Sequence, residues 1–307
     1  MKILLTGCTG QLGAALRDQL KDFAEIIAPT RAQFDLADTA QIANYVQQVQ
    51  PDLILNPAAY TAVDLAEKES ELAYRVNAIA PQLLAEQARL LDIPLIHFST
   101  DYVFDGSKAD AQAQLLPYIE DDQCAPLNVY GASKLAGERA IVNSGCKHLI
   151  LRTSWVYSGV GKNFLLTILR LAKEKSELKI VNDQYGTPSS SYFLSQSCHH
   201  ILELMTQASD QTAWWKAHQG IYHLTPQGST NWCDFSRAIV EHAQQLGLLH
   251  QLPTIHGIPS AEYPTPARRP RNSCLDKSKA QAHFDLTLPD WEQSLHECLA
   301  HIAHYGH

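Results

Sequence analysis

The sequence has no apolar run long enough to cross a membrane and no basic block that could follow a phosphate backbone. A spanning helix needs roughly 18 uncharged apolar residues in a row. Only Ile3, Leu4 and Leu5 precede Thr6 and Gly7, which is too short for the core of a secretory signal. The 24 basic residues against 32 acidic residues give a net charge of −8. We therefore expect neither a spanning helix nor nucleic-acid binding.

The seven cysteines include no C-x-x-C pair, and their odd number cannot close into a complete set of intrachain disulfides. This usage predicts a reducing, cytoplasmic environment. Apolar residues make up 45% of the chain and charged residues 18%, as in an ordinary compact protein. The length of 307 residues is enough for two domains or one large α/β unit.

Short leucine-rich or β-branched runs alternate with longer amphipathic segments in the first half of the chain, which is typical of βαβ units around a parallel sheet. The runs that predict strands are Ile3–Leu5, Ile26–Ile27, Leu53–Leu55, Leu95–Phe98 and Leu149–Leu151. A helical pattern covers 70–91, and Pro81 within it should cause a kink or break because it lacks an N–H.

Beyond about Tyr157 the alternation loosens and helical segments outnumber strands. The whole pattern predicts an α/β fold, a doubly wound parallel sheet with a smaller, mostly helical C-terminal lobe for the substrate. We place the sheet domain at 1–157, with further elements from about 178–207, and the second lobe at 158–307. The lobes are expected to interleave in sequence.

Three glycines follow the first predicted strand, where the first helix should begin. Gly7, Gly10 and Gly13 have the spacing G-x-x-G-x-x-G, with Gln11 and Leu12 before the last. Glycine allows a tight turn and a close backbone approach to a pyrophosphate, and a helix N-terminus favours the negative charge. The pattern predicts a Rossmann-type NAD(P)-binding turn.

The residues after the second predicted strand bear on the choice of coenzyme. A carboxylate there would hold the ribose 2′-hydroxyl of NAD and repel the 2′-phosphate of NADP. The segment 28–31 offers no carboxylate, and Arg31 is suited to meet the extra phosphate. We expect NADPH, with NADH use left open, and the alternative is that Arg31 is only a surface residue.

Tyr130 and Lys134 lie four residues apart, hence on one face of a helix. A nearby cation favours the phenolate and should bring the pKa of the tyrosine towards neutrality. Ser99, Thr100 and Asp101 follow the fourth predicted strand, where ligands of parallel sheets bind. The other reading of these three residues is helix or turn capping. The order of turn, hydroxyl and Y-x-x-x-K pair favours proton transfer to a carbonyl.

Together these motifs resemble the extended short-chain dehydrogenases/reductases and, among them, the dTDP-4-dehydrorhamnose reductase family. The matching segments are 7–13, 56–64, 99–106, 130–135, 152–157, 182–186 and 269–273. The resemblance implies reduction of dTDP-4-dehydro-β-L-rhamnose (dTDP-6-deoxy-L-lyxo-4-hexulose) to dTDP-β-L-rhamnose by hydride transfer from NAD(P)H. This is the last step of dTDP-L-rhamnose biosynthesis, and it implies a product used in a cell-surface polysaccharide such as the O antigen of lipopolysaccharide.

The resemblance also implies roles for single residues. Tyr130 would supply the proton, Lys134 would bind the nicotinamide ribose and tune Tyr130, and Thr100 would hydrogen-bond the substrate oxygen. The substrate-contacting positions are Thr100, Asp101 and Trp155. The cofactor-contacting positions, besides Tyr130 and Lys134, are Gly10, Gln11, Leu12, Asp35, Leu36, Ala59, Tyr60 and Thr61.

Other polar clusters have ordinary explanations. Adjacent His199 and His200 point to different helix faces, so we expect solvated surface and no metal ligands there. From the resemblance alone, a homodimer with Mg²⁺ at C-terminal carboxylates stays open, with Asp290, Glu292 and Glu297 as candidates. The arginine cluster is expected to reach the substrate diphosphate or to form surface salt bridges, and its members are Arg268, Arg269 and Arg271.

Two rival functions stay open. A nucleotide-sugar 4-epimerase uses the same tyrosine and lysine but retains its NAD and returns the hydride. A catalytically silent regulatory subunit is the other, because the regulatory β subunit of methionine adenosyltransferase resembles this reductase family. The presence of Tyr130, Lys134 and Thr100 weighs against the silent subunit.

Overall fold

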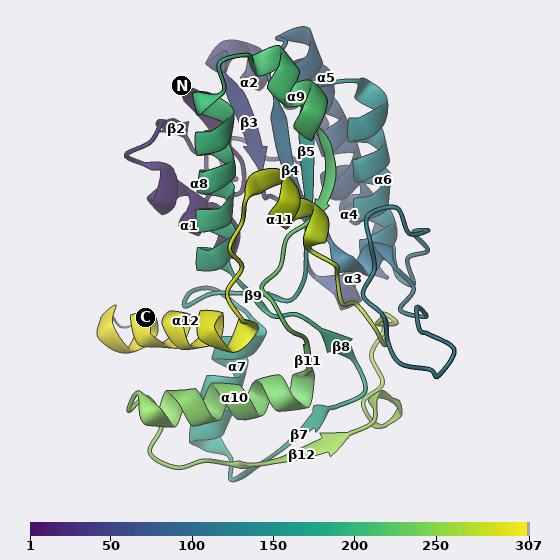
Figure 1. Ribbon diagram of the computed structural model, residues 1–307, viewed down its shortest axis with the longest axis vertical. Helices are drawn as coiled ribbons and strands as arrows, with labels where there is room; N and C mark the ends of the chain where they lie inside the picture. The colour runs from purple at the N-terminus through teal and green to yellow at the C-terminus, as the bar shows by residue number, and fades with distance from the viewer. Residues whose placement is uncertain (306–307) are drawn as a thin grey trace.

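Six parallel strands form the central sheet of the upper lobe in Figure 1, in the order β10-β5-β4-β3-β1-β2. They are β1 (Lys2–Leu5), β2 (Glu25–Ile27), β3 (Leu53–Asn56), β4 (Leu95–Thr100), β5 (His148–Thr153) and β10 (Gly220–His223). The chain runs from β1 outwards to β2 and returns to β3 on the other side of β1. In open α/β sheets dinucleotides bind at such a reversal, outside the carboxyl ends of the strands, which here are β1 and β3.

Helices cover both faces of the sheet, because alternate strand residues point to opposite sides. On one face α1 (Gln11–Leu20) and α8 (Ser191–Gln207) enclose a core that includes Leu5 and Leu55. On the other face, residues such as Leu4 and Ile54 pack under α2 (Ile42–Val49), α5 (Ala80–Leu90) and α6 (Val129–Ser144). The doubly wound sheet predicted from the sequence is confirmed.

The predicted interruption of the helix over 70–91 lies before Pro81 and not at it. The segment consists of α4 (Ser70–Tyr74), the π-helical η2 (Arg75–Ile79) and α5, with Pro81 in the first turn of α5. Proline is tolerated in a first helical turn because its missing N–H would have no partner there. The π turn η2 runs directly into α5, with the Ala80 N–H donating to the Arg75 carbonyl oxygen five residues earlier.

The lower lobe in Figure 1 is mostly helical, as predicted, and has its own apolar core. Its elements are α7 (Phe164–Glu174), α10 (Trp232–Gln245) and α12 (Trp291–Tyr305), with β7 (Glu177–Val181) paired to β12 (Thr254–Ile258). Of the stretch 178–207, β7 thus lies in this lobe, whereas α8 covers the main sheet.

The structure describes residues 1–305, and the remaining elements are short. They are η1 (Thr39–Gln41), α3 (Val63–Ala66), η3 (Asp101–Val103), β6 (Val156–Tyr157), β8 (Tyr185–Gly186), β9 (Ser189–Ser190), α9 (Gln211–His218), β11 (Thr230–Asn231), η4 (Ser260–Glu262) and α11 (Ser278–Phe284). Within residues 1–305, no helix is long and apolar enough to traverse a bilayer.

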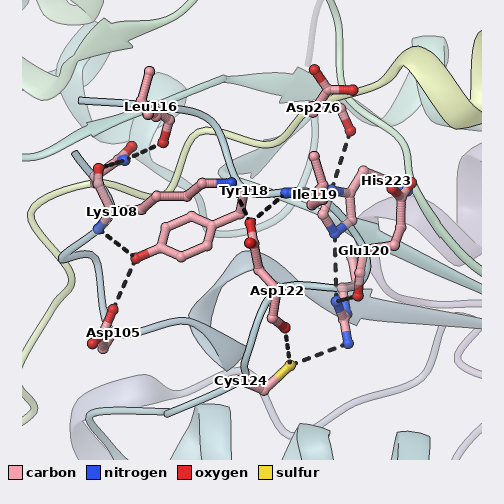
Figure 2. A network of polar contacts seen from close by, with 12 residues as sticks. Asp105, Lys108, Leu116, Tyr118, Ile119, Glu120, Asp122, Cys124, His223 and Asp276 are labelled. Carbon is pink, nitrogen blue, oxygen red and sulfur yellow. Dashed lines mark hydrogen bonds and ion pairs between the residues drawn. The ribbon is translucent and has the colours of Figure 1, made fainter. Parts of the chain in front are cut away.

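The segment between η3 and α6 is held by polar contacts, shown in Figure 2, more than by regular structure. The Tyr118 hydroxyl donates to Asp105 Oδ1 at 2.8 Å and accepts from the Lys108 backbone N–H at 3.0 Å. The buried guanidinium of Arg152 donates to the Cys124 thiol at 3.4 Å and to Glu138 of α6 at 2.7 Å. Since the segment leads directly into α6, these contacts fix where α6 begins.

Candidate active site

Helix α6 lies unusually close to the strand tips. The Asn128 side chain caps it by accepting from the Gly131 N–H at 2.8 Å. A Cβ atom on Gly131 would lie 2.1 Å from the Tyr102 carbonyl oxygen, and one on Gly137 would lie 2.1 Å from that of Asn77. Only glycine permits these contacts, so Gly131 brings α6 against η3, just beyond the end of β4, and Gly137 brings it against η2.

The structure brings the predicted Tyr130, Thr100 and Asp101 together. Thr100 Oγ1 donates to Asp101 Oδ1 at 3.0 Å and accepts from the Tyr102 N–H at 3.2 Å. A hydrogen bond with Thr100 lowers the pKa of the Tyr130 phenol, although burial has the larger, opposite effect. The rings of Tyr102 and Tyr130 meet edge to face, with centroids 6.0 Å apart.

The pKa of Tyr130 departs from the sequence prediction, which had Lys134 bringing it towards neutrality. Burial raises this pKa to about 12, and the contribution of Thr100 offsets only part of the rise. The Lys134 ammonium cannot compensate, because it is directed elsewhere, donating to the Phe98 carbonyl oxygen at 2.7 Å. The phenol is therefore protonated at neutral pH, which is the state that a proton donor needs.

Lys134 is fully enclosed, with 1% of its surface exposed. Its Nζ lies 3.0 Å from His97 Nε2 as well as contacting Phe98. Burial lowers the pKa of Lys134 to about 7, against the opposing effect of the Glu138 carboxylate. An ammonium has three donors. The Phe98 carbonyl accepts one of them, and His97 Nε2 accepts another when it carries no proton, which leaves one N–H for a ligand.

The glycine turn fits a dinucleotide phosphate. Gly7 has a left-handed φ of +58°, and a Cβ on Gly13 would lie 2.0 Å from the Gly7 carbonyl oxygen. Gly10 caps α1 without a side-chain hydrogen bond, so the first N–H groups of this helix have no capping side chain. An anion can take that place, as the sequence predicts for Gln11, Leu12 and Gly13.

Gln11 also joins the two lobes. Its Oε1 accepts from Ser158 Oγ at 3.1 Å and from Asn163 Nδ2 at 2.9 Å. Asn163 in turn caps α7 by accepting from the Leu166 N–H at 2.9 Å. The first residue of α1 is therefore held by the second lobe.

Sequence reasoning missed Asn77, which organises the predicted cofactor segment 59–61. Asn77 Oδ1 accepts from the Tyr60 N–H at 2.8 Å, and its Nδ2 donates to the Tyr60 carbonyl at 3.0 Å and to Ser133 Oγ at 3.0 Å. The side chain thus ties Ala59, Tyr60 and Thr61 to α6. The one related signal in the sequence is Pro81, four residues further on, which predicts an irregularity in this helix.

Arg31 has a carboxylate neighbour, Asp35. Its side chain is 74% exposed, and its Nε donates to Asp35 Oδ2 at 3.2 Å. Leu36, the next predicted contact, is buried in the core beneath α2. Asp35 is therefore the carboxylate that pairs with Arg31 in this structure.

Trp155 is held in a strained position. It has a left-handed φ of +48°, and its ring stacks on Trp232 with centroids 3.5 Å apart. A Cβ on Gly186 would lie 2.6 Å from the Trp155 ring and 2.7 Å from Ser273 Oγ. Ser273 Oγ donates to the Tyr185 carbonyl oxygen of β8 at 3.2 Å, and Ser273 also lowers the pKa of the Asp101 carboxyl against the larger, opposite effect of burial.

The remaining polar clusters have partners of their own. Arg269 donates twice to Asp64, at 3.0 and 2.8 Å. Of the two roles expected for this arginine, the structure therefore shows the salt bridge. His199 lies 3.0 Å from Gln19, and His200 lies 2.9 Å from the Phe284 carbonyl. Across residues 1–305, His, Cys, Asp and Glu side chains form no group of three or more that could hold a metal ion. That region includes Asp290, Glu292 and Glu297.

A parallel doubly wound sheet, a glycine turn after its first strand and the Tyr130–Lys134 pair define a nicotinamide-dependent reductase of the extended short-chain type. The model of the family described as RmlD substrate binding domain matches residues 1–304. The dTDP-4-dehydrorhamnose reductase of Escherichia coli (strain K12) is 42% identical over 296 residues, which is 95% of each chain. The chain belongs to the dTDP-4-dehydrorhamnose reductase family.

Solved structures agree. The dTDP-4-dehydrorhamnose reductase of Clostridium acetobutylicum ATCC 824 superposes with a TM-score of 0.86 at 33% identity, covering 98% of this chain and 99% of that one. The enzyme of Bacillus anthracis str. Ames, solved in complex with NADP, has a TM-score of 0.86 at 32% identity, with coverage of 98% and 99%. The family, fold class and NAD(P)H-dependent reductase class predicted from the sequence are confirmed, and the roles of single residues stay predictions.

Proposed function

We propose that this chain reduces the C4 ketone of dTDP-4-dehydro-β-L-rhamnose to dTDP-β-L-rhamnose, with Tyr130 as the proton donor. The observation that carries this is the phenol of Tyr130, which lies against Thr100 at the end of β4 and has its pKa raised to about 12. Family relatives named dTDP-4-dehydrorhamnose reductase support the substrate. A carbonyl oxygen beside these two groups would receive a proton as negative charge develops on it.

Each residue has a separate task in this proposal. The bound nicotinamide supplies the hydride. Tyr130 gives its proton to the substrate oxygen, and Thr100 holds the phenol and the Asp101 carboxyl in place. Lys134 offers its remaining N–H to the nicotinamide ribose. Trp155 lies against the sugar with the apolar face of its indole, which Trp232 backs from the other side.

The coenzyme is NADPH in this proposal, with NADH as the less favoured substrate. Arg31 is exposed and can turn from Asp35 towards a 2′-phosphate, because an exposed ion pair of this kind is weak. The B. anthracis relative was solved with NADP, which supports this choice. The test is the KM for NADPH in wild type and Arg31→Ala. An increase confined to NADPH is expected, and an unchanged KM would remove Arg31 from coenzyme selection.

The activity is tested by following the absorbance of reduced nicotinamide with the dTDP-keto sugar supplied, in parallel with NADH and NADPH. Stoichiometric oxidation of the coenzyme is expected. Purified protein that carries tightly bound NAD and oxidises no added coenzyme would indicate the 4-epimerase. Absence of any turnover, together with an intact fold, would indicate the regulatory subunit.

The setting of the reaction is also part of the proposal. A cytoplasmic enzyme acting as a homodimer, and feeding a rhamnose-containing surface polysaccharide, fits a nucleotide-sugar substrate. Sedimentation of the protein with Mg²⁺ and with a chelator tests the assembly. A single dimer species in both conditions would separate the dimer from any role of Mg²⁺.

A further inference from the structure

A chain of buried polar side chains runs beneath the strand tips, from the residue before the glycine turn to Lys134. Thr6 Oγ1 donates to Asn56 Oδ1 at 2.6 Å. Asn56 Nδ2 lies 2.9 Å from His97 Nδ1, and His97 Nε2 lies 3.0 Å from Lys134 Nζ. None of the four residues is more than 1% exposed. The register pairs Asn56 of β3 with His97 of β4, so the contacts pass between neighbouring strands.

His97 is unusual in its setting. Every residue of β4 is buried, and an imidazole there costs free energy unless both ring nitrogens have partners. Both have partners here, Asn56 on one side and Lys134 on the other. Burial and the nearby Lys134 charge hold the pKa of His97 well below its usual range, so the ring is neutral. One ring nitrogen donates and the other accepts.

The chain can serve Lys134 in both of its protonation states. With Lys134 neutral, Nε2–H of His97 donates to Nζ, and Nδ1 of His97 accepts from Asn56 Nδ2. The structure has the Asn56 amide in this orientation, with Nδ2 towards His97. With Lys134 charged, Nε2 accepts from the ammonium and Nδ1–H donates to the amide oxygen of Asn56 turned over. In that second state the amide nitrogen of Asn56 faces Thr6 Oγ1, so the Thr6 hydroxyl changes from donor to acceptor.

We propose that His97 is a positioning residue, which holds Lys134 Nζ in place beneath the strand tips as a hydrogen-bond acceptor and is itself oriented by Asn56 and Thr6. The inference rests on the proposed function of Lys134 in binding the nicotinamide ribose. Sheet formation alone does not require this polar chain, because an apolar residue at position 97 would suit a buried strand better.

The other groups facing Lys134 do not replace His97. Glu138, one turn further along α6, favours the charged form of Lys134, but its carboxylate is bonded to the buried Arg152 of β5. From η2, the group that reaches this part of α6 is the uncharged Asn77, bonded to Ser133. The remaining acceptor on Lys134 is the Phe98 carbonyl, which is fixed in β4.

The test compares three substitutions at one position. Gln places an amide oxygen near the place of Nε2, so His97→Gln keeps an acceptor for Lys134. Asn reaches only the place of Nδ1, so His97→Asn keeps a polar partner for Asn56 but not for Lys134. His97→Leu removes both. For each variant we would measure the titration midpoint of Lys134 from the NMR shift of its isotope-labelled Cε, the Kd for NADPH and the thermal midpoint.

Loss of the acceptor disfavours the charged ammonium, because a hydrogen bond to the charged form stabilises it. In His97→Leu and His97→Asn, the Lys134 midpoint should fall below that of wild type, and NADPH should bind about tenfold more weakly. His97→Gln should restore both values. The proposal would be overturned if the NADPH Kd and the Lys134 midpoint ranked the variants in the order of their thermal midpoints, with His97→Asn closest to wild type. An unchanged Lys134 midpoint in His97→Leu would overturn it as well.

Lys134→Met separates this inference from the proposed function. If that variant keeps the NADPH Kd and the turnover of wild type, the proposed role of Lys134 fails and the inference with it. If Lys134→Met loses both while His97→Leu keeps both, only the role of His97 is wrong.

Discussion

At the scale of single residues, burial decides the protonation states around the ketone site. Tyr130 and Asp101 lie on either side of Thr100, and burial raises the pKa of both, to about 12 and about 7. Lys134 lies under the same strand tips, and burial lowers its pKa to about 7. The protein therefore keeps the Tyr130 phenol protonated at neutral pH, whereas Asp101 and Lys134 both change protonation state near pH 7.

Tyr130→Phe deletes the proton but keeps the ring and its packing. Turnover should fall by about 100-fold or more, which is the usual contribution of a general acid, while the Kd for NADPH stays near that of wild type. Coenzyme fluorescence and steady-state rates measure the two quantities on one preparation. Near-wild-type turnover would exclude Tyr130 as the proton donor.

Asp101 should make the stability of the protein depend on pH. Its pKa is about 7 in the folded protein and 3.8 in the reference state, so between these values the folded state holds a proton that the unfolded state has released. Stability contributed by this group is present in acid and is lost as the pH rises towards 7. The free energy of unfolding of wild type should therefore fall relative to Asp101→Asn across this range. Parallel curves in urea denaturation would contradict this.

At the scale of elements, close approach is what assembles the site. Glycines let α1 and α6 touch the backbone of neighbouring segments, and Gly186 of β8 lets the Trp155 ring lie flat between β8 and Trp232. Because interiors are close-packed, even one methyl group at these contacts must displace its neighbour.

Gly186→Ala should act mainly on the sugar nucleotide. The added methyl group would lie 2.6 Å from the Trp155 ring and must push it from its place. We expect a higher KM for the dTDP-keto sugar, an unchanged Kd for NADPH and an altered tryptophan emission. If the KM of the sugar stays constant while emission changes, Trp155 does not contact the substrate.

The same elements show what a sequence can predict. The strands β1, β3, β4 and β5 follow from continuous apolar runs, and the glycine turn follows from its place between strand and helix. Asn77 and His97 could not be predicted as parts of the site, because their importance depends on partners 17 to 56 residues away in sequence. The pairing of β7 with β12 is likewise non-local, between residues 177–181 and 254–258.

At the scale of the whole molecule, one buried ion pair ties several parts together. Arg152 of β5 and Glu138 of α6 are each 2% exposed and 2.7 Å apart. Arg152 also donates to the Cys124 thiol, in the segment that precedes α6, at 3.4 Å. Removing one partner of such a pair leaves an uncompensated charge in the interior.

Glu138→Gln should cost about 3–5 kcal/mol of unfolding free energy, a large part of the total for an ordinary protein. The matched control is Glu174→Gln, which breaks the Arg170–Glu174 pair. Its atoms are 2.8 Å apart, but its side chains are 60% and 52% exposed. That variant should lose at most about 0.5 kcal/mol. Equal losses in urea denaturation would show that burial does not set the value of these pairs.

The most direct measurement of the proposed reaction uses NADPH that carries deuterium at the transferable position of the nicotinamide, with dTDP-4-dehydro-β-L-rhamnose as the second substrate. Direct reduction predicts one deuterium at C4 of the sugar in the product, in proportion to the coenzyme oxidised. A product without deuterium at C4, or conversion of the sugar with no loss of reduced coenzyme, would contradict it.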